Sequence, residues 1–355
     1  MSGALLALDP VVKTPTIQDV ARIAQVSAAT VSRALSRPER VTVATRERVS
    51  EAIRITGYTL NQSARSLRLQ TARTILVALP DIGNPFFAAI LDAIEREATQ
   101  RGYGVLVANR FVRGNTDPLR DYFLSNRTDG LLLLDGSIDR EELARLTRAP
   151  INLPLIVACE SIPNGQFHTV TTDNAYAAEQ ATRYLMSLGH TRIGHIRGPV
   201  GNVLSIEREA GFTAALLAGQ VRQLAEWMFD GDFSMEGGAR AARALLSLSE
   251  RPTAIFAAND ESAIGFISEM ARTGLRCPED VSVVGFDDLG IAAHFLPPLT
   301  TMRQPREALG RLAAEALIDL IEGVPGKFVP EHFVLSSQLI VRGSTAPPSA
   351  HRKST

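Results

Sequence analysis

The sequence predicts a small all-α domain at the N-terminus, followed by a larger α/β domain with doubly wound parallel sheets. Within the first sixty residues, apolar side chains recur with helical spacing, whereas from residue 74 apolar runs alternate with helix-length amphipathic stretches. The chain has 355 residues, more than one compact core usually holds. Roughly 270 residues of α/β pattern are more than one sheet with its covering helices usually contains, so we expect two lobes with a cleft between them.

Three short helices are expected in the N-terminal domain. The first has one apolar face (Ile17, Val20, Ala21 and Ala24), and Thr16 with Asp19 suggests a capping box. The second is predicted over residues 28–35 with Ser27 as its N-cap, after a three-residue break. The third is predicted over residues 45–55 and ends at Gly57 in a left-handed conformation. This spacing is typical of a helix-turn-helix, whose second helix enters the major groove of DNA.

The α/β part is read from its apolar runs. Buried parallel strands are predicted over residues 74–79, 104–108, 130–134, 155–158, 192–196, 254–258 and 281–285. Helices are predicted over residues 87–101, 175–188, 206–219, 236–246 and 262–273. This repeated strand and helix order is the pattern of doubly wound sheets.

Charge is distributed unevenly along the chain. The formal net charge is only -1, but residues 13–73 hold eleven Lys or Arg against four acids, a net +7. The remaining 26 basic and 34 acidic residues carry -8. Such an asymmetry is expected when one small domain meets a polyanion and the rest of the protein does not.

Several function classes lack their sequence signals. Cys159 and Cys277 stand far apart with no CxxC spacing, so we expect no disulfide framework, no metal site and no cofactor. The apolar run over residues 4–8 is too short for an export signal or a membrane span, which favours the cytoplasm. Phosphate-binding and hydrolase motifs are absent, so an enzyme is not expected.

Residues 26–35 carry the DNA-binding pattern, with small polar side chains and Arg33 on the outer face of the second predicted helix. Around them stand Thr16-Ile17-Gln18-Asp19-Val20-Ala21, Thr30-Val31-Ser32-Arg33, Gly57-Tyr58, Ala64-Arg65-Ser66-Leu67 and Asn84-Pro85-Phe86-Phe87. In these motifs the chain resembles the lactose-repressor (LacI/GalR) family of bacterial transcriptional regulators, closest in wording to its cytidine-repressor branch. The resemblance covers nearly the whole chain.

The resemblance implies a set of DNA-contacting residues. Ala28, Ala29 and Arg33 would face bases, whereas Ser27, Thr30, Ser32 and Asn61 would lie near phosphates; Thr16, Ala64, Arg65, Leu67 and Arg68 complete the set. Alanine can contact only a thymine methyl, so direct readout should depend on Arg33, which suits guanine. Residues 61–69 match the family's hinge helix, with Leu67 as a minor-groove wedge. The alternative is that Leu67 packs against the second domain. Leu60 stands where the family often has proline.

The resemblance also implies an effector site between the lobes, at the carboxyl ends of strands. Its predicted residues are Phe86, Phe87, Glu160, Asp173, Arg208, Phe233, Asn259 and Asp287. Carboxylates accept hydrogen bonds from hydroxyls and aromatic rings stack on sugar or base faces, so the set suits a sugar, polyol or nucleoside. For Asp173 and Asp287 a helix cap or a solvated loop remains the alternative. Asn202 stands where the purine-repressor branch has a purine-binding arginine, which disfavours guanine and hypoxanthine.

Domain boundaries follow from the resemblance and the patterns together. We expect a flexible N-terminus (1–14), the helix-turn-helix domain (15–59), a hinge helix and linker (60–72), an effector-binding and dimerisation domain (73–343) and a disordered tail (344–355). The effector-binding and dimerisation domain should have a periplasmic-binding-protein-like fold, with one lobe over 73–172 and 304–330 and the other over 174–302 and 332–343.

The sequence thus predicts a DNA-binding regulator, a repressor whose affinity for palindromic operator DNA is controlled by a small effector. The family binds DNA as a homodimer. Two alternatives stay open: a sugar-binding protein without a DNA function, and an α/β enzyme. The missing export signal and the basic N-terminal domain weigh against the first, and the missing catalytic motifs weigh against the second.

Overall fold

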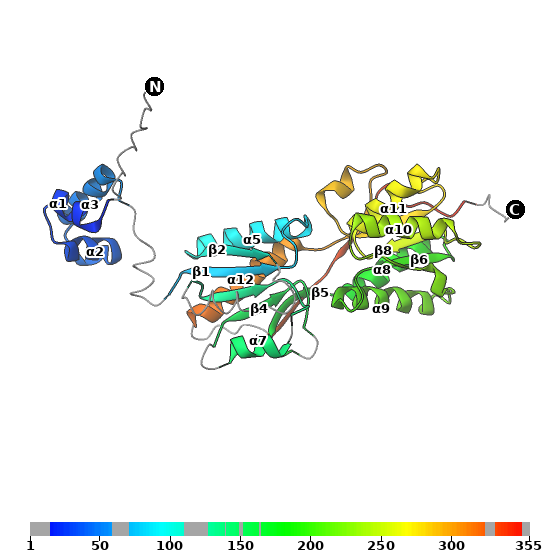
Figure 1. Ribbon diagram of the computed structural model, residues 1–355, viewed down its shortest axis with the longest axis horizontal. Helices are drawn as coiled ribbons and strands as arrows, with labels where there is room; N and C mark the ends of the chain where they lie inside the picture. The colour runs from blue at the N-terminus through cyan, green and yellow to red at the C-terminus, as the bar shows by residue number, and fades with distance from the viewer. Residues whose placement is uncertain are drawn as a thin grey trace, which may run out of the picture. The chain divides into compact units, whose positions relative to one another are not determined.

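The computed structural model describes residues 15–58, 71–109, 127–138, 140–148, 152–162, 165–323 and 331–349. The chain divides into two compact units, residues 1–70 and 71–355 (Figure 1). The first, called the N-terminal unit, contains the predicted helix-turn-helix, and the second, called the sensor unit, contains the predicted effector site. Each unit is described by itself.

The N-terminal unit contains helices α1 (Ile17–Ala24), α2 (Ala28–Ser36) and α3 (Val43–Thr56), with a 3-10 turn η1 (Pro38–Arg40). The predicted caps are confirmed: the Asp19 carboxylate accepts a bond from the Thr16 backbone N–H (2.9 Å), and Ser27 Oγ accepts one from the Thr30 N–H (3.1 Å). Gly57 ends α3 with φ 64°. The core of this unit is formed by Val20, Ala21, Ala24, Val31, Ala34, Val49 and Ala52.

The sensor unit contains two six-stranded sheets, each in its own lobe. The first has the order β11-β5-β4-β3-β1-β2, formed by β1 (Thr74–Leu79), β2 (Gly104–Asn109), β3 (Gly130–Leu133), β4 (Leu155–Ala158), β5 (His168–Thr172) and β11 (His332–Leu335). The second has the order β12-β10-β9-β8-β6-β7, formed by β6 (Ile193–Arg197), β7 (Met228–Asp230), β8 (Ala254–Ala257), β9 (Ser282–Asp287), β10 (Thr300–Arg303) and β12 (Gln338–Ile340). Among the described pairings, β10 with β12 is antiparallel and the others are parallel.

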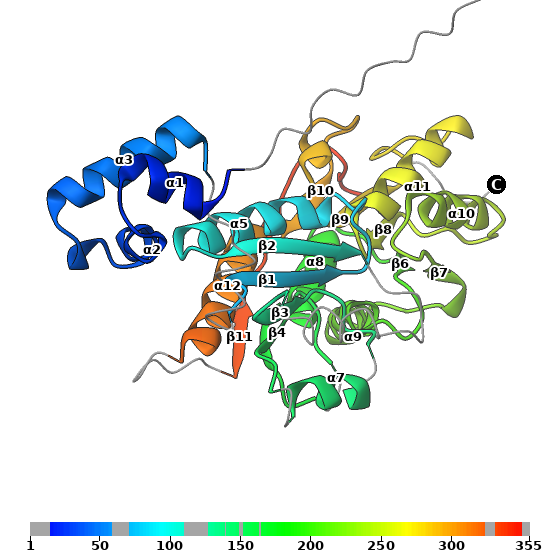
Figure 2. The same cartoon turned by 60° about the vertical axis from the view of Figure 1, so that its left-hand side comes forward.

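Helices cover both sheets, as a doubly wound fold requires. The first lobe has α5 (Phe86–Gln100), α7 (Arg140–Thr147) and α12 (Arg306–Glu322), and Figure 2 shows α5 lying along β2. The second lobe has α8 (Asn174–Ser187), α9 (Val203–Ala218), α10 (Met235–Leu246) and α11 (Asp260–Arg272), with 3-10 turns η2 (Ala225–Trp227) and η3 (Gly290–Ala293). Helices α5 and α12, α8 and α9, and α10 and α11 pack as pairs. The predicted fold class is confirmed.

The seven predicted strands and five predicted sensor helices are all present, with ends shifted by up to three residues. The sequence missed β5, β7, β10, β11, β12, α7 and α12. Strands such as β5 (His-Thr-Val-Thr-Thr) are short and rich in polar residues, so no apolar run marks them. Their positions are decided by pairing with neighbouring strands.

The predicted lobe boundary near residue 331 differs from the structure. β11 pairs with β5 in the first sheet, and β12 pairs with β10 in the second. The chain therefore crosses between the sheets at residues 336–337, so the segment 332–335 belongs to the first lobe. The two other crossings lie at Asp173, between β5 and α8, and at residues 304–305, between β10 and α12.

The tail also differs from its prediction as a disordered segment beginning at residue 344. Ser344 is fully buried, and its carbonyl accepts a bond from the Val283 N–H (2.8 Å). His190 Nε2 donates to the carbonyl of Ala346 (2.9 Å). Residues 344–349 therefore pack along the second lobe, because they supply partners for strand β9 and for a buried histidine; residues 350–355 lie outside the described ranges.

His195 on β6 is buried in the core of the second lobe. Its ring stacks on Phe212 (5.0 Å between centroids) and on Phe256 (4.9 Å), and its Nδ1 donates to the Phe256 carbonyl (2.9 Å). Burial lowers the pKa of His195 from 6.5 to about 4. The ring is therefore neutral in the folded protein at neutral pH.

This burial predicts acid sensitivity. As pH falls below 6.5 the unfolded chain takes up a proton at His195 and the folded chain does not, so the stabilisation present above pH 6.5 is lost progressively towards pH 4. Between pH 7 and pH 5 this one ring should cost about 2 kcal/mol of unfolding free energy. Urea unfolding of the full-length protein, followed by the fluorescence of Trp227, should show a flatter pH profile for His195→Phe. The exposed His294→Gln serves as control, and equal profiles for His195→Phe and the parent would contradict the prediction.

Helices α8 and α9 approach closely at Gly211. A Cβ at this position would lie 1.9 Å from the Ala175 carbonyl oxygen, a backbone atom that cannot move independently of α8. Only glycine allows this packing, and it positions the preceding turn of α9 against the second sheet.

We predict that Gly211→Ala destabilises the sensor unit by about 3 kcal/mol, because overpacking forces the two helices apart. Gly290→Ala is the matched control, since a Cβ there meets nothing within 4 Å. Urea unfolding monitored through Trp227 measures both changes. Similar midpoints for the two variants would show that the α8–α9 contact does not require glycine.

Candidate functional site

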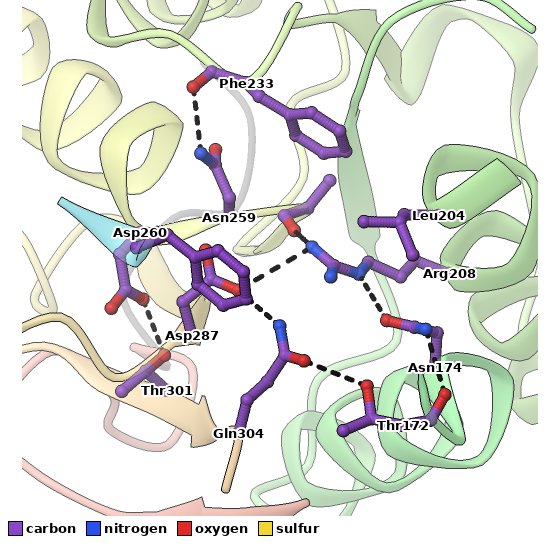
Figure 3. A network of polar contacts seen from close by, with 12 residues as sticks. Thr172, Asn174, Leu204, Arg208, Phe233, Asn259, Asp260, Asp287, Thr301 and Gln304 are labelled. Atoms are coloured by element: carbon purple, nitrogen blue, oxygen red, sulfur yellow. Dashed lines mark hydrogen bonds and ion pairs between the residues drawn. The ribbon is translucent and has the colours of Figure 1, made fainter. Parts of the chain in front are cut away.

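The centre of the candidate effector site is Arg208, on the first half of α9, only 2% exposed. Its Nη1 donates to the Ala258 carbonyl (2.5 Å) and its Nε to Asn174 Oδ1 (3.0 Å). The guanidinium lies over the ring of Phe286, 3.8 Å from its centroid. Figure 3 shows these groups converging from α8, α9 and the ends of strands β8 and β9. A buried cation is thus held by hydrogen bonds and an aromatic face.

Asp287 ends β9 and supplies the nearest negative charge, 4.0 Å from Arg208 Nη1. Its Oδ1 accepts a bond from Gln304 Nε2 (2.7 Å), and Gln304 Oε1 accepts one from Thr172 Oγ1 (2.9 Å). Burial raises the pKa of Asp287 to about 6, and Arg208 opposes this rise. Asp287 is thus ionised at pH 7 and connected through Gln304 to strand β5 of the other lobe (Figure 3).

Asp260, the first residue of α11, is a second buried carboxyl beside Asp287. It accepts bonds from Thr301 Oγ1 (2.6 Å) and the Leu289 N–H (2.7 Å). Burial and the neighbouring Asp287 raise the pKa of Asp260 to about 8. Leu289, in the loop that follows β9, packs in the core of the first lobe. By accepting the Leu289 N–H, Asp260 therefore holds this contact between the loop and the first lobe in place.

A direct contact between the lobes is made by Glu160, which follows β4. Its Oε2 accepts a bond from the Gly136 N–H (2.8 Å), and its Oε1 accepts one from Asn202 Nδ2 (3.1 Å). Asn202 is the N-cap of α9 in the second lobe. Burial raises the pKa of Glu160, and the hydrogen bonds from Gly136 and Asn202 oppose the rise.

Phe233 and Asn259 line another side of the same group. Asn259 Nδ2 donates to the Phe233 carbonyl (2.9 Å), while Asn259 Oδ1 caps α11. The Phe233 ring lies 5.7 Å from the Arg208 guanidinium, and a Cβ at Gly198 would come within 2.3 Å of that ring. Glycine at 198 therefore leaves the space that the aromatic ring occupies.

The structure brings together four of the predicted effector residues, Arg208, Phe233, Asn259 and Asp287, with Glu160 close enough to influence the charge of Arg208. Asp173 is exposed and is the N-cap of α8, where it accepts a bond from the Tyr176 N–H (2.9 Å). The structure thus agrees with the alternative that Asp173 is a helix cap. Phe86 and Phe87 pack in the core of the first lobe, and no contact with Arg208 is observed for them in the described part of the chain.

Several members of the network escaped sequence reasoning: Thr172, Asn174, Asp260, Gln304 and the interlobe role of Asn202. Each follows a strand or begins a helix, which was a usable signal for Asn174 and Asp260, whose neighbours Asp173 and Asn259 were predicted. Gln304 follows β10, a strand that the sequence did not reveal.

The candidate DNA-binding surface lies on α2. Ser27, Ala29 and Arg33 are exposed, while Ala28, Thr30 and Ser32 are half-buried and Thr16 stands exposed at the start of α1. Ser27 and Thr30 hydroxyls bond each other (2.9 Å). Asn61, Ala64, Arg65, Leu67 and Arg68 lie outside the described residues, so their predicted roles stay predictions.

Among the described residues, no group of three or more His, Cys, Asp or Glu side chains is placed to hold a metal ion. No helix in the same part of the chain is both long and apolar enough to cross a membrane.

Comparisons with known proteins agree with this architecture. Residues 16–61 match the family "Bacterial regulatory proteins, lacI family", and residues 182–345 match "Periplasmic binding protein-like domain". The HTH-type transcriptional repressor CytR of Escherichia coli (strain K12) is 38% identical over 333 residues, covering 93% of this chain and 96% of that protein.

Two solved structures extend the comparison. The lac repressor dimer bound to operator and the anti-inducer ONPF superposes with a TM-score of 0.84 at 28% identity, covering 94% of this chain and all of that one. The transcriptional regulator CelR in complex with cellobiose gives 0.70 at 32% identity, covering 93% and 99%.

Fold, helix-turn-helix and relatives together define a DNA-binding transcriptional repressor. The chain belongs to the lacI family of bacterial regulatory proteins, as its motifs predicted. Its named relatives are repressors, in agreement with the expectation that this protein is not an enzyme.

The Arg208 network predicts a strong stability effect. Arg208→Met should cost about 3–5 kcal/mol at pH 8, because it leaves the ionised Asp287 buried without its cation. Adding Asp287→Asn should recover at least about 1 kcal/mol, since the pair is coupled. Arg240→Met is the control: its ion pair with Asp232 is about half exposed, and its loss should cost under about 1 kcal/mol. Equal losses for Arg208→Met and Arg240→Met in urea unfolding would refute the assignment.

Proposed function

We propose that this repressor binds a small polar effector, a sugar, polyol or nucleoside, between its two lobes, and that the effector controls its affinity for operator DNA. The observation that carries the proposal is the buried group around Arg208. This group lies where strands of both sheets end, and it joins residues of both lobes through Gln304. Open α/β sheets place their ligands at this edge.

The chemistry of the group supports a ligand with hydroxyls. Asp287 and Glu160 are acceptors, Asn259 and Arg208 are polar groups fixed by their own hydrogen bonds, and Phe233 offers an aromatic face. Fixed acceptors with an adjacent ring suit vicinal hydroxyls on an apolar face. The solved relatives named above hold cellobiose in one case and ONPF in the other.

A mechanism follows from the three crossings between the lobes. An effector that bonds both Asp287 and Glu160 changes the free energy of closing one lobe on the other, because these carboxylates belong to different lobes. In a homodimer formed through the sensor domains, lobe movement would alter the spacing of the two hinge segments, residues 61–69. We propose that the effector acts as an inducer and lowers operator affinity, and that the protein works in the cytoplasm.

On the DNA side, α2 would lie in the major groove with Arg33 reading guanine, and Leu67 would wedge into the minor groove. The lac repressor structure contains a dimer on operator DNA. We propose the same assembly here, a homodimer on a palindromic operator.

Footprinting with the full-length protein tests the proposal. DNA from the protein's own genomic neighbourhood is probed with and without pooled nucleosides, pentoses, hexoses and polyols. A protected palindrome that a pool weakens supports operator binding and induction. A pool that strengthens protection reverses the sign of the mechanism, and pools that change nothing in footprints or in protein melting contradict effector control by these classes.

Arg33 provides the mutational test on DNA. Arg33→Ala should weaken binding to the identified operator about 10- to 100-fold and affect binding to unrelated DNA much less, because one bidentate base contact discriminates by about 1–3 kcal/mol. Arg272→Ala, an exposed arginine of the sensor unit, is the control. Fluorescence anisotropy at several salt concentrations measures both. An equal loss on operator and unrelated DNA would assign Arg33 to phosphate contact instead.

A further inference from the structure

The candidate effector site contains more buried carboxyl groups than buried cations among the described residues. Asp287, Asp260 and Glu160 are buried carboxyl groups, and Glu207 lies half-buried beside Asn174. Arg208 is the one buried cation in this group among the described residues. Asp288, which follows Asp287 in the chain, is already paired with Arg303 (2.6 Å) and Arg342 (2.7 Å). An incoming ligand therefore meets acceptors in excess.

Arg208 is only partly available to an anion, since two of its three guanidinium nitrogens already donate within the protein. Nε and Nη1 bond to Asn174 and to the Ala258 carbonyl, and the face of the guanidinium is covered by Phe286. Its charge is shared with Asp287, 4.0 Å away, and is also felt by Glu160 and Glu207. A phosphate that took over Nε and Nη1 would break the bonds that tie Arg208 to Asn174 of α8 and to the Ala258 carbonyl.

The orientation of Glu160 is set by Asn202, whose side-chain amide cannot be flipped without losing its hydrogen bonds. Asn202 Oδ1 accepts bonds from the Leu204 N–H (2.9 Å) and the Ser205 N–H (3.2 Å) at the start of α9. The Nδ2 of the same amide must then point away from the helix, where it donates to Glu160 Oε1. The Gly136 N–H fixes the other oxygen, and a Cβ at Gly136 would come 2.9 Å from it. The carboxylate is thus held in place by neutral donors, with no counter-ion in direct contact.

We propose that this site selects uncharged effectors rich in hydroxyl donors and rejects their phosphate monoesters, and that Glu160 is the residue that determines this selection. The inference rests on the proposed function and deepens it. Hydroxyls can donate to Glu160 and Asp287, whereas a phosphate group brings further negative charge into a region of low dielectric where, among the described residues, Arg208 is the one buried cation. Glu160 is decisive because its neutral partners leave its charge uncompensated, while Asp287 shares the charge of Arg208.

Matched pairs of ligands test the selection. Full-length protein on operator DNA is titrated at constant ionic strength with ribose and ribose 5-phosphate, cytidine and cytidine 5′-monophosphate, and glucose and glucose 6-phosphate. In any pair that acts, the uncharged member should act at a concentration at least 100-fold lower than its ester. An ester that acts at an equal or lower concentration than its parent overturns the inference.

Removing the charge of Glu160 tests whether this residue determines the selection. Glu160→Gln keeps the size and an acceptor for Asn202 but removes the charge, so the ratio of ester to parent affinity should change at least tenfold in favour of the ester. Glu226→Gln, an exposed acid of η2, should leave the ratio unchanged. If Glu160→Gln does not fold, Asp287→Asn gives the same comparison with a smaller expected change. An unaltered ratio in both variants shows that these carboxylates do not set the selection.

A third measurement does not depend on finding the effector. Melting of the full-length protein in inorganic phosphate is compared with melting in chloride at equal ionic strength. We expect no phosphate-specific stabilisation. A stabilisation that Arg208→Met abolishes would show that Arg208 accepts anions and would overturn the inference. If no pair acts and phosphate has no effect, the site still excludes anions, and the failure belongs to the proposed effector class.

Discussion

Burial of one guanidinium, that of Arg208, constrains the rest of the sensor unit. A buried cation is tolerated only when its donors are bonded and an opposite charge is near. Three segments meet this requirement: α8 supplies Asn174, the end of β8 supplies the Ala258 carbonyl, and β9 supplies Phe286 and Asp287. Helix α9 must then lie close to α8, which Gly211 permits. The packing of the second lobe and the polarity of its ligand-facing edge therefore have the same origin.

Polar residues at the crossings connect this group to the other lobe. Gln304 lies where the chain passes from β10 to α12 and bonds both Asp287 and Thr172, residues of different sheets. Glu160 and Asn202 add a second bond between the lobes. These bonds join the two lobes directly, so a ligand that competed with them would change the free energy of the observed lobe arrangement. Gln304, Glu160 and Asn202 thus connect the two lobes through side-chain hydrogen bonds.

Electrostatics separates the tasks of the two units. The segment 13–73 carries +7 and the remainder -8, so attraction to DNA is confined to the N-terminal unit. Within the sensor the surplus of negative charge extends to the buried site, where Glu160 and Asp287 stand against Arg208. The positive charge that attracts DNA and the buried carboxyl groups of the candidate effector site thus lie in separate units of the chain.

Local interactions are what the sequence by itself determined. The caps at Thr16 and Ser27, the end of α3 at Gly57 and the seven apolar strands could be predicted, because each depends on residues a few positions apart. Tertiary structure alone decided that Phe86 and Phe87 pack in the first lobe and that residues 344–349 lie along β9. It also brought Gln304 to Thr172, 132 residues away. In the sequence alone, many polar residues are equally possible partners for one another. Burial and the pairing of distant strands decide which of them meet, so the members of the site can be named only from the tertiary structure.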